Sequence, residues 1–333
     1  MNTEEKTSEY IVPNYGRFTI APVRGQGVWL WDEDGKRYLD FACGIAVCSL
    51  GHCHPALVEA LKRQGEKLWH CSNLYQIGAQ AELAEMLVEK VVGIEGKCFF
   101  CNSGAEANET LVKLARKYGH ATAAEHGGRA RYEVITFDGS FHGRTMCGIS
   151  ATGQEKVKVG FAPLLEGFRH VPWNDAGALR AAVNENTVAI LVEPVQGEGG
   201  INVVSEELLQ AAVELREEKG VLLMFDEVQS GLGRTGDLCS WRSVAAGVEP
   251  DAISWAKGLG GGFPIGGIWA GARESGDGKL CDLLQPGSHG TTYGGTPLAS
   301  AVALAVVGTI VDADLAANAS GVGRYIVERA ESW

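Results

Sequence analysis

Several features typical of other protein classes are missing from this 333-residue sequence. The longest apolar run, Leu298–Val311, spans 14 residues, so it is too short to cross a bilayer and predicts a buried helix instead. The first residues, Met1–Glu5, are polar and lack the apolar stretch of a secretory signal. The 29 Lys and Arg are outnumbered by 41 Asp and Glu and form no basic stripe, which argues against nucleic-acid binding.

A disulfide framework and a metal site are not expected either. The nine cysteines are an odd number in a long chain without a signal, which indicates reduced thiols in the cytoplasm. Cys98 and Cys101 lie in an apparent strand, where residues three apart point to opposite faces and cannot share a zinc ion. The Cys and His residues of segment 48–54 have no second ligand pair at a suitable spacing. We therefore expect packing cysteines and no metal.

Short apolar runs alternate with helical patterns along the chain. Asp34–Gly35 predicts a hairpin turn between β-like pieces at 24–31 and 37–41. The later alternation is typical of an α/β protein with a largely parallel sheet, which binds ligands at the carboxyl ends of its strands. The predicted strands are 98–101, 133–137, 188–193, 221–226, 252–255 and 267–270, and the predicted helices are 56–67, 80–92, 105–118, 176–184, 205–219 and 297–311.

A candidate anion-binding turn follows the first strand of this alternation. The strand 98–101 leads through Ser103 to Gly104 and Ala105, where a helix begins. Free backbone N–H groups and the positive end of the helix dipole at such a start suit a phosphate. A plain strand–helix turn is the alternative, because this motif alone has low specificity.

Two charged residues follow apolar strands. Asp226 ends the strand 221–226, where a buried acid is costly unless it has a partner such as a protonated pyridinium nitrogen. An ion pair with an arginine, or a helix cap, is the alternative. Lys257 lies between the strand 252–255 and a glycine-rich turn, and burial there would lower its pKa and favour Schiff-base chemistry. A solvated surface lysine is the alternative.

The turn after the strand 133–137 adds an aromatic ring, a histidine and an arginine. Phe141, beside His142, can stack on a flat cofactor ring, and Arg144 can hold a carboxylate in bidentate fashion. Core packing for Phe141 and a surface ion pair for Arg144 are the alternatives. Together, the phosphate turn, stacking ring, acid and lysine predict a site for pyridoxal 5′-phosphate (PLP), whose chemistry needs each of these groups.

Six stretches also match a known family in order and spacing: NSGAEANE (102–109), FDGSFHGRT (137–145), EPVQGEGG (193–200), LLMFDEVQSGLGRTG (222–236), AKGLGGGFPIGG (256–267) and HGTTYGGTPLA (289–299). In these stretches the chain resembles the class III, fold-type I aminotransferases. The resemblance implies an α/β PLP-dependent transferase fold with a mostly parallel seven-stranded sheet flanked by helices. It also implies a homodimer with shared active sites. The implied reaction is ping-pong transamination of N-acetylornithine with 2-oxoglutarate in arginine biosynthesis, giving N-acetylglutamate 5-semialdehyde and glutamate.

The resemblance assigns cofactor roles to individual residues. Lys257 forms the imine with the coenzyme and moves the proton, and Asp226 pairs with the pyridine nitrogen. Gln229 lies near the ring hydroxyl, and Thr292 reaches the phosphate of the other subunit. The implied cofactor-binding residues are Ser103, Gly104, Ala105, Phe141, His142, Asp226, Gln229, Lys257 and Thr292.

The resemblance also implies the substrate-binding residues. Arg144 takes the substrate α-carboxylate with Thr291 nearby, while Glu193 and Glu198 border the pocket, where a glutamate gates the two amino donors in relatives. Ornithine aminotransferases carry a tyrosine where this chain has Ile45, and its absence favours an acylated substrate.

The family pattern predicts three parts. These are an N-terminal segment belonging to a small domain (1–50), a PLP-binding large domain (51–312), and the start of a truncated C-terminal small domain (313–333). Family members continue beyond the position of Trp333 and supply an arginine for the second substrate.

Three alternatives remain open at this point. Gly231–Gly236 matches the dinucleotide-binding pattern G-x-G-x-x-G of NAD-dependent oxidoreductases, although no convincing helix follows it. The chain could be a catalytically inactive relative. Within the family, the activity could be that of an ornithine, succinylornithine or 4-aminobutyrate aminotransferase, because one methylene or acyl group changes binding by only about 1–3 kcal/mol.

Overall fold

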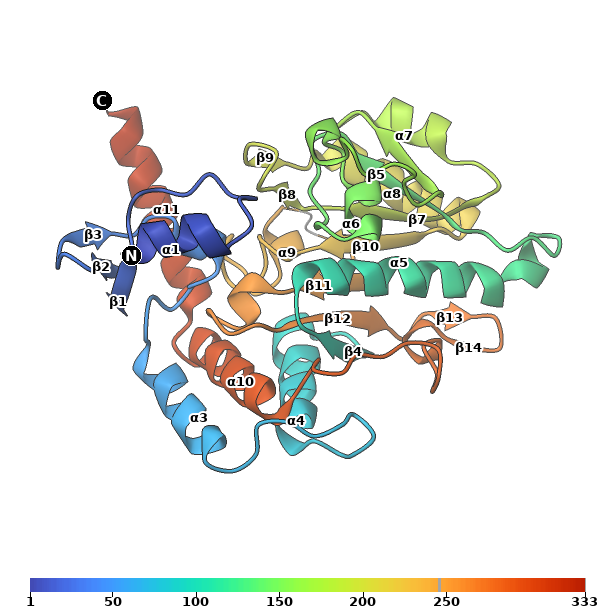
Figure 1. The fold of residues 1–333 in the computed structure, drawn as a ribbon. Helices are drawn as coiled ribbons and strands as arrows, with labels where there is room; N and C mark the ends of the chain where they lie inside the picture. The colour runs from blue at the N-terminus through green and yellow to red at the C-terminus, as the bar shows by residue number, and fades with distance from the viewer. Residues whose placement is uncertain (245–246, 333) are drawn as a thin grey trace.

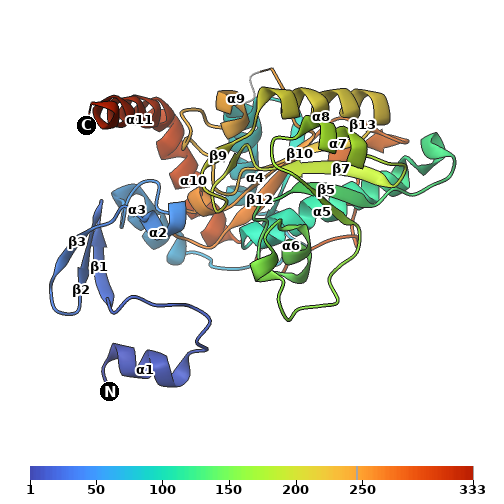
Figure 2. The same cartoon turned by 90° about the horizontal axis from the view of Figure 1, so that it is seen from above.

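The computed structural model describes residues 1–244 and 247–332 (Figures 1 and 2). Its centre is one seven-stranded sheet. The strands are β4 (Gly96–Cys101), β5 (Glu133–Phe137), β6 (Phe168–Val171), β7 (Thr187–Val192), β10 (Leu222–Asp226), β11 (Ala252–Trp255) and β12 (Gly266–Gly271). Their order is β4-β12-β11-β10-β7-β5-β6, and every neighbouring pair is parallel except the two that contain β12. The predicted mostly parallel seven-stranded α/β fold is confirmed.

Helices cover both faces of this sheet, as Figure 2 shows for α8 on one side and α5 and α6 on the other. In β10, Leu222 and Met224 pack with the helix that follows β4, whereas Leu223 and Phe225 pack on the opposite face. Because both faces are buried, the strands read as continuous apolar runs. The helices are α3 (Pro55–Gly65), α4 (Gly78–Met86), α5 (Gly104–Ala121), α6 (Met146–Ala151), α7 (Ala176–Ala182), α8 (Glu206–Lys219), α9 (Ser240–Val244) and α10 (Pro297–Asp312).

The N-terminal segment lies to one side of the large sheet, as do both chain termini (Figures 1 and 2). The predicted turn at Asp34–Gly35 is confirmed, but the single piece expected at 24–31 is wrong. It is divided between two antiparallel strands, because Gly27 has a φ of 55° and turns the chain. The elements of this segment are α1 (Thr3–Tyr10), β1 (Pro22–Gln26), β2 (Trp29–Asp32), β3 (Arg37–Leu39) and α2 (Cys43–Ala46).

The ends of several helices follow from local capping and backbone geometry. Ser205 caps α8 as predicted, since its Oγ accepts a hydrogen bond from the Leu208 N–H at 3.2 Å. The helix expected at 80–92 is instead α4 followed by the π-helical turn η1 (Leu87–Val92). The short elements are η2 (Ala123–His126), η3 (Glu155–Val157), η4 (Lys257–Leu259), η5 (Leu280–Asp282), β8 (Val195–Gln196), β9 (Asn202–Val203), β13 (Glu274–Ser275) and β14 (Gly278–Lys279).

The C-terminal part consists of α10 and the helix α11 (Leu315–Glu331). The apolar run that predicted a buried helix is α10, which packs against α3 and α4. Among the described residues, no single helix is long and apolar enough to cross a membrane. The pair α10 and α11, bent by 62°, meets the length and composition criteria only when joined. The expected division at 1–50, 51–312 and 313–333 stays a prediction, and its last residue, Trp333, lies outside the described residues.

A buried cluster of Asp251, Arg216 and Arg273 stabilises one edge of the core. The side chain of Asp251, which is fully buried, accepts hydrogen bonds from Arg216 of α8 at 2.8–3.2 Å and from Arg273 at 3.1 Å. It also accepts the Leu223 N–H of β10 at 2.8 Å. The carboxylate therefore joins α8, β10 and the segment after β12.

Candidate active site

A cavity of about 400 Å³ lies where the carboxyl ends of β4, β5, β7, β10 and β11 meet. Its size is in the range of small-molecule and cofactor sites. The structure brings together the predicted residues Ser103, Gly104, Ala105, Phe141, His142, Arg144, Glu193, Glu198, Asp226, Gln229 and Lys257 in its lining. Val47, Asn102, Asn108, Val228 and Phe263 also contribute to the wall.

The turn between β4 and α5 has the form of an anion cradle. Ser103 caps the helix, since its Oγ accepts from the Glu106 N–H at 3.3 Å, which leaves the first N–H groups of α5 directed outward. Gly104 is needed here because a Cβ at this position would lie 2.7 Å from Cγ1 of Val228. Free N–H groups at a helix N-terminus beside a cavity fit the phosphate of PLP.

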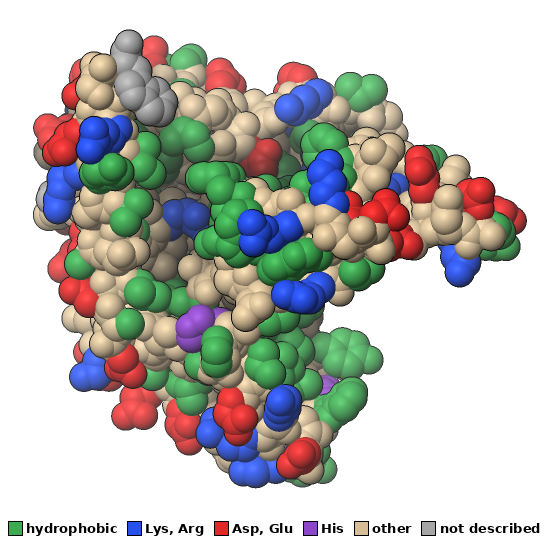
Figure 3. All heavy atoms as spheres, turned by 90° about the vertical axis from the view of Figure 1, so that its left-hand side faces the viewer, with side chains coloured by type: hydrophobic (Ala, Val, Ile, Leu, Met, Phe, Trp, Pro, Cys, Tyr) green, Lys and Arg blue, Asp and Glu red, His purple; other side chains and the backbone are tan. Residues whose placement is uncertain are grey.

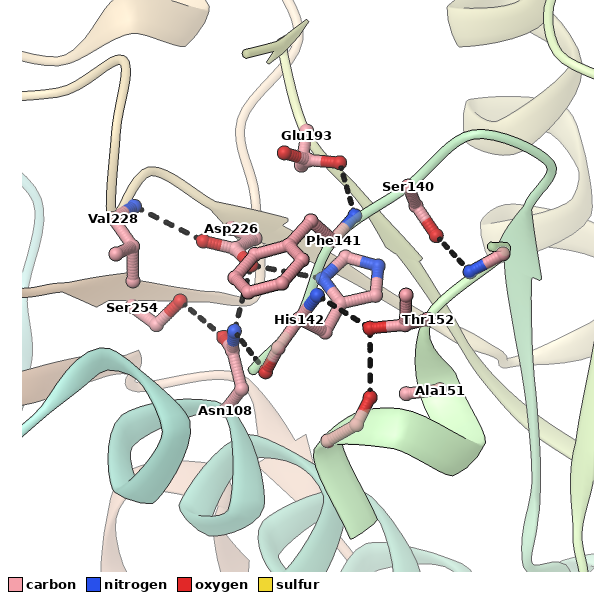
Figure 4. Close-up of polar contacts among 12 residues, drawn as sticks. Asn108, Ser140, Phe141, His142, Ala151, Thr152, Glu193, Asp226, Val228 and Ser254 are labelled. Atoms are coloured by element: carbon pink, nitrogen blue, oxygen red, sulfur yellow. Dashed lines mark hydrogen bonds and ion pairs between the residues drawn. The ribbon is translucent and has the colours of Figure 1, made fainter. Parts of the chain in front are cut away.

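Asp226 is held by a network of short polar contacts (Figure 4). Its Oδ2 accepts a hydrogen bond from Nδ2 of Asn108 at 2.6 Å and lies 2.8 Å from Nδ1 of His142. Its Oδ1 accepts the Val228 N–H at 3.0 Å. Within the described part of the chain, no lysine or arginine forms an ion pair with this carboxylate, so the alternative of an Asp–Arg pair is not seen. A cationic ring nitrogen in the cavity fits this arrangement.

Three residues of this network were not predicted. Ser254 of β11 donates from its Oγ to Oδ1 of Asn108 at 2.6 Å, and this orients the amide so that its Nδ2 faces Asp226. Oγ1 of Thr152 accepts the His142 N–H at 2.9 Å. Asn108 lies one turn after Gly104 on the buried face of α5, and Ser254 interrupts an apolar strand. Polar residues at such buried positions are the signal that could have indicated them.

Glu193 is a buried carboxyl on the wall of the cavity. It comes directly after β7, and its Oε2 accepts the Phe141 N–H at 3.0 Å (Figure 4). Burial raises the pKa of Glu193 well above its usual range, and the nearby negative charge of Asp226 adds to this effect. Glu198, by contrast, lies exposed at the rim. The two predicted pocket glutamates therefore occupy different environments.

Lys257 follows β11 and lies half-buried in the cavity lining, with a φ of 41°. Burial lowers the pKa of Lys257, although the negative charges of Asp226, Glu198 and Glu193 oppose this effect. A lowered pKa increases the share of neutral amine, which is the nucleophilic form that reacts with a carbonyl. The lysine predicted for imine chemistry is thus partly buried rather than fully solvated, and no direct ion pair with the described residues neutralises it.

Arg144 is exposed at the mouth of the cavity. Its Cζ lies 5.5 Å from the ring centroid of Phe141, and the described residues provide no ion-pair partner for it. A guanidinium in this position is available for a carboxylate. Gln229 faces the same cavity, where Gly197 leaves room for it, because a Cβ at Gly197 would lie 1.5 Å from its Oε1.

Thr291 and Thr292 are not in this cavity. They line a second cavity of about 400 Å³, whose other walls include Phe99, Asn102 and His289. The two cavities share Asn102, whose Nδ2 donates to Oγ1 of Thr291 at 3.3 Å. The roles expected for both threonines stay predictions.

The glycine pattern Gly231–Gly236 has a packing role. A Cβ at Gly231 would lie 2.8 Å from Oε2 of Glu227, and one at Gly233 would lie 3.4 Å from Ile310 of α10. The five-residue helix α9 follows the pattern, in place of the long helix that a dinucleotide site requires. Because these glycines have no side chain, the backbone packs closely against other parts of the protein.

The fold and the site define a PLP-dependent transferase of fold type I, because the buried acid, the lysine and the turn at the start of α5 line one cavity at the carboxyl edge of the sheet. The chain belongs to the class-III aminotransferase family, whose model matches residues 10–332. It is therefore an aminotransferase, and its substrates are small amino and keto acids.

Known proteins similar to the chain agree with this assignment. It is 48% identical over its whole length to the acetylornithine aminotransferase of Caldanaerobacter subterraneus subsp. tengcongensis, of which it covers 80%. Among solved structures, it superposes on the ornithine aminotransferase of Toxoplasma gondii ME49 with a TM-score of 0.89 and 34% identity, covering 98% of this chain and 76% of that one. The acetylornithine aminotransferase of Elizabethkingia anophelis gives a TM-score of 0.82 and 32% identity, covering 99% and 77%.

Proposed function

We propose that the chain transfers the amino group of N-acetylornithine to 2-oxoglutarate, giving N-acetylglutamate 5-semialdehyde and glutamate. The observation that carries the chemistry is the convergence of Asp226, Lys257 and the Ser103–Ala105 cradle on one cavity. The substrate is supported by the relatives at 46–49% identity that are acetylornithine aminotransferases.

The residues around the cavity divide the work of binding and proton transfer. When bound, PLP supplies an electron sink that stabilises negative charge at the carbon bearing the reacting amino group, which is Cδ of N-acetylornithine and Cα of glutamate. The N–H groups of Gly104 and Ala105 would bind the phosphate, Phe141 would lie against the ring, and Asp226 would hold a proton on the pyridine nitrogen. Lys257 would hold the coenzyme through its amine and would move the proton at the carbon that carries the transferred amino group. The lowered pKa of Lys257 increases the share of neutral amine, which is the form that can act as a base.

The substrate contacts come from the rim of the cavity. Arg144 binds the α-carboxylate, and Glu193 and Glu198 border the remaining part of the substrate. Ile45, two residues before the cavity residue Val47, is apolar where the resemblance gives ornithine aminotransferases a tyrosine. An apolar side chain there is compatible with an acylated amine, whereas a free second amino group needs a polar partner.

A homodimer is part of this proposal. Thr292 is exposed and lies outside its own subunit's cavity, as expected of a residue that serves the phosphate of a partner. Large apolar side chains are also exposed, among them Phe41, Trp69, Leu74 and Tyr75, and Figure 3 shows apolar side chains around a hollow on one side of the molecule. Exposed patches of this kind mark protein interfaces. The nine free cysteines support a cytoplasmic location, where thiols stay reduced.

Absorption spectroscopy tests the proposal directly. The purified chain is mixed with PLP and its visible spectrum is recorded before and after addition of N-acetylornithine, with ornithine, succinylornithine and 4-aminobutyrate compared at equal concentrations. We expect a yellow band from Lys257-linked coenzyme that bleaches fastest with N-acetylornithine and returns on addition of 2-oxoglutarate. Lys257→Ala is the matched control, since it should bind PLP without the band.

Other results would revise the proposal in defined ways. Faster bleaching by ornithine would make the chain an ornithine aminotransferase. A band that does not change on addition of any of the four donors would contradict catalysis by this chain, although its coenzyme site would stand. Absence of the band would contradict the site itself.

A further inference from the structure

His289 lies between helix α5 and the loop that carries Thr291 and Thr292, and both of its ring nitrogens form hydrogen bonds. Its Nδ1 lies 2.7 Å from Nζ of Lys113, and its Nε2 lies 3.0 Å from Oγ1 of Thr110. Because a lysine ammonium can only donate, Nδ1 is the acceptor and Nε2 carries the hydrogen. Oγ1 of Thr110 accepts that hydrogen and donates its own to the carbonyl of Glu106 at 2.8 Å. Each polar atom of the imidazole is therefore used.

The ring is also fixed by packing. Its centroid lies 4.8 Å from that of Phe99 on β4, at an interplanar angle of 44°. Lys113 and Glu109 of α5 are the charged groups that face it, and burial lowers the pKa of His289, with the charge of Lys113 acting in the same direction. The neutral imidazole is the form that fits these contacts.

The loop that starts at His289 has a second attachment two residues later. Oγ1 of Thr291 accepts from Nδ2 of Asn102, which directly precedes the phosphate cradle at Ser103. His289 is thus attached in the second and third turns of α5, and Thr291 is attached next to the start of the same helix. Gly290 and Thr292 are exposed, whereas Gly294 is buried and its carbonyl accepts a hydrogen bond from Nδ2 of Asn73 at 3.0 Å.

We propose that His289 is a positioning residue for cofactor binding, which aligns the loop carrying Thr291 and Thr292 on the helix that forms the phosphate cradle. This inference rests on the proposed function, in which Thr292 serves the phosphate of a partner subunit. Helix α5 then helps to position both phosphate-binding elements, the cradle of its own subunit and the loop presented to the other, while Asn73 holds the far side of that loop.

The test measures the Kd for PLP of apoenzyme variants by titration, together with kcat and KM of the holoenzyme. His289→Phe keeps an aromatic ring against Phe99 but removes both hydrogen bonds, and it should raise the Kd about tenfold. His289→Gln offers an amide acceptor and donor and should stay within about threefold of wild type. His120→Gln, an exposed histidine of the same helix, is the control and should change nothing.

Two further readouts separate positioning from simple folding. Lys113→Met should raise the Kd by itself but add little to His289→Phe, because both changes remove one interaction. When the pH falls from about 7.5 to about 5.5, protonation of His289 removes the acceptor for Lys113. The ratio of the wild-type Kd to the His289→Gln Kd should therefore rise.

The outcomes are distinguishable from a failure of the proposed function. If Thr292→Val weakens PLP binding while His289→Phe does not, the inference is overturned and the proposed function stands. If Gln and Phe at position 289 are equally impaired, ring packing rather than hydrogen bonding is responsible, and the inference is again overturned. If Thr292→Val leaves the Kd unchanged, the proposed role of Thr292 fails, and the inference built on it fails with it.

Discussion

Nδ1 of His142 lies 2.8 Å from Oδ2 of Asp226, and both side chains are almost completely closed off from solvent. The same carboxylate oxygen also accepts the amide of Asn108, so the acid is fixed from two sides. A buried carboxylate is costly unless cations or donors compensate it. The protein supplies donors on one side and leaves the cavity side open, and this arrangement suits a cationic ring nitrogen.

Asp226→Asn is expected to lower kcat by about 10²–10⁴-fold, because it keeps the size of the side chain but removes the charge that holds the proton on the ring nitrogen. Steady-state rates at saturating amino donor check this. Asp277→Asn, at an exposed position, is the control and should leave kcat unchanged. A variant at position 226 with a wild-type kcat would remove Asp226 from the mechanism.

Arg144→Ala is expected to raise KM for amino donors that carry an α-carboxylate by about ten- to a hundredfold with a smaller effect on kcat, because a charge-assisted contact to the carboxylate is lost. An amine without an α-carboxylate should be unaffected, which makes it the internal control. Arg129→Ala removes an exposed arginine that pairs with Glu185 and should leave both constants unchanged. Equal losses with both kinds of donor would show that Arg144 does not bind the carboxylate.

The sequence allowed most of the sheet to be predicted, because its strands are buried on both faces and therefore appear as uniform apolar runs. β6 could not be identified in this way. It lies at the edge of the sheet, and only Val171 of its four residues is buried. The division of segment 22–32 into two strands was also missed, since it depends on the positive φ of Gly27 rather than on hydropathy. The pattern of apolar residues does not report the backbone conformation of a single glycine.

The sequence also allowed part of the site to be predicted. Asp226 ends an apolar strand and Lys257 follows one, and the parallel sheet brings such positions to one edge. Glu193 was expected only from the family resemblance. Asn108 and Ser254 were missed. Their positions on buried faces mark them as polar residues that need partners, but which partners they have depends on contacts between α5 and β11. The sequence also could not show that Thr291 and Thr292 face a separate cavity.

Asp251→Ala is expected to destabilise the fold by about 3–5 kcal/mol, because it leaves two partly buried arginines without their shared carboxylate. Chemical denaturation of the apoenzyme measures this change in the free energy of unfolding. Glu185→Ala, which breaks only the exposed pair with Arg129, should cost less than about 1 kcal/mol. Similar values for both variants would contradict a structural role for the buried cluster.

Glu193→Gln is expected to change how stability depends on pH. The folded-state pKa of Glu193 is raised by burial and by the charge of Asp226, so between its ordinary pKa and this raised value the folded state holds more protons than the unfolded state. The contribution of the neutral carboxyl is fully present below the ordinary pKa and is lost as the pH rises through this window. Glutamine does not titrate, so the variant should gain stability relative to wild type over the pH range that begins at the ordinary glutamate pKa of about 4.3 and extends upward.

Denaturant titrations of both apoenzymes at several pH values across that range measure the difference in unfolding free energy. Glu198→Gln is the matched control, because the same substitution at an exposed carboxyl should give a nearly constant difference. If the difference in unfolding free energy for Glu193→Gln also stays constant with pH, the folded protein stabilises the charged carboxylate of Glu193 as well as water does. The hydrogen bond from the Phe141 N–H would then outweigh the burial, and Glu193 would enter the reaction as a fixed anion rather than as an acid that can exchange its proton.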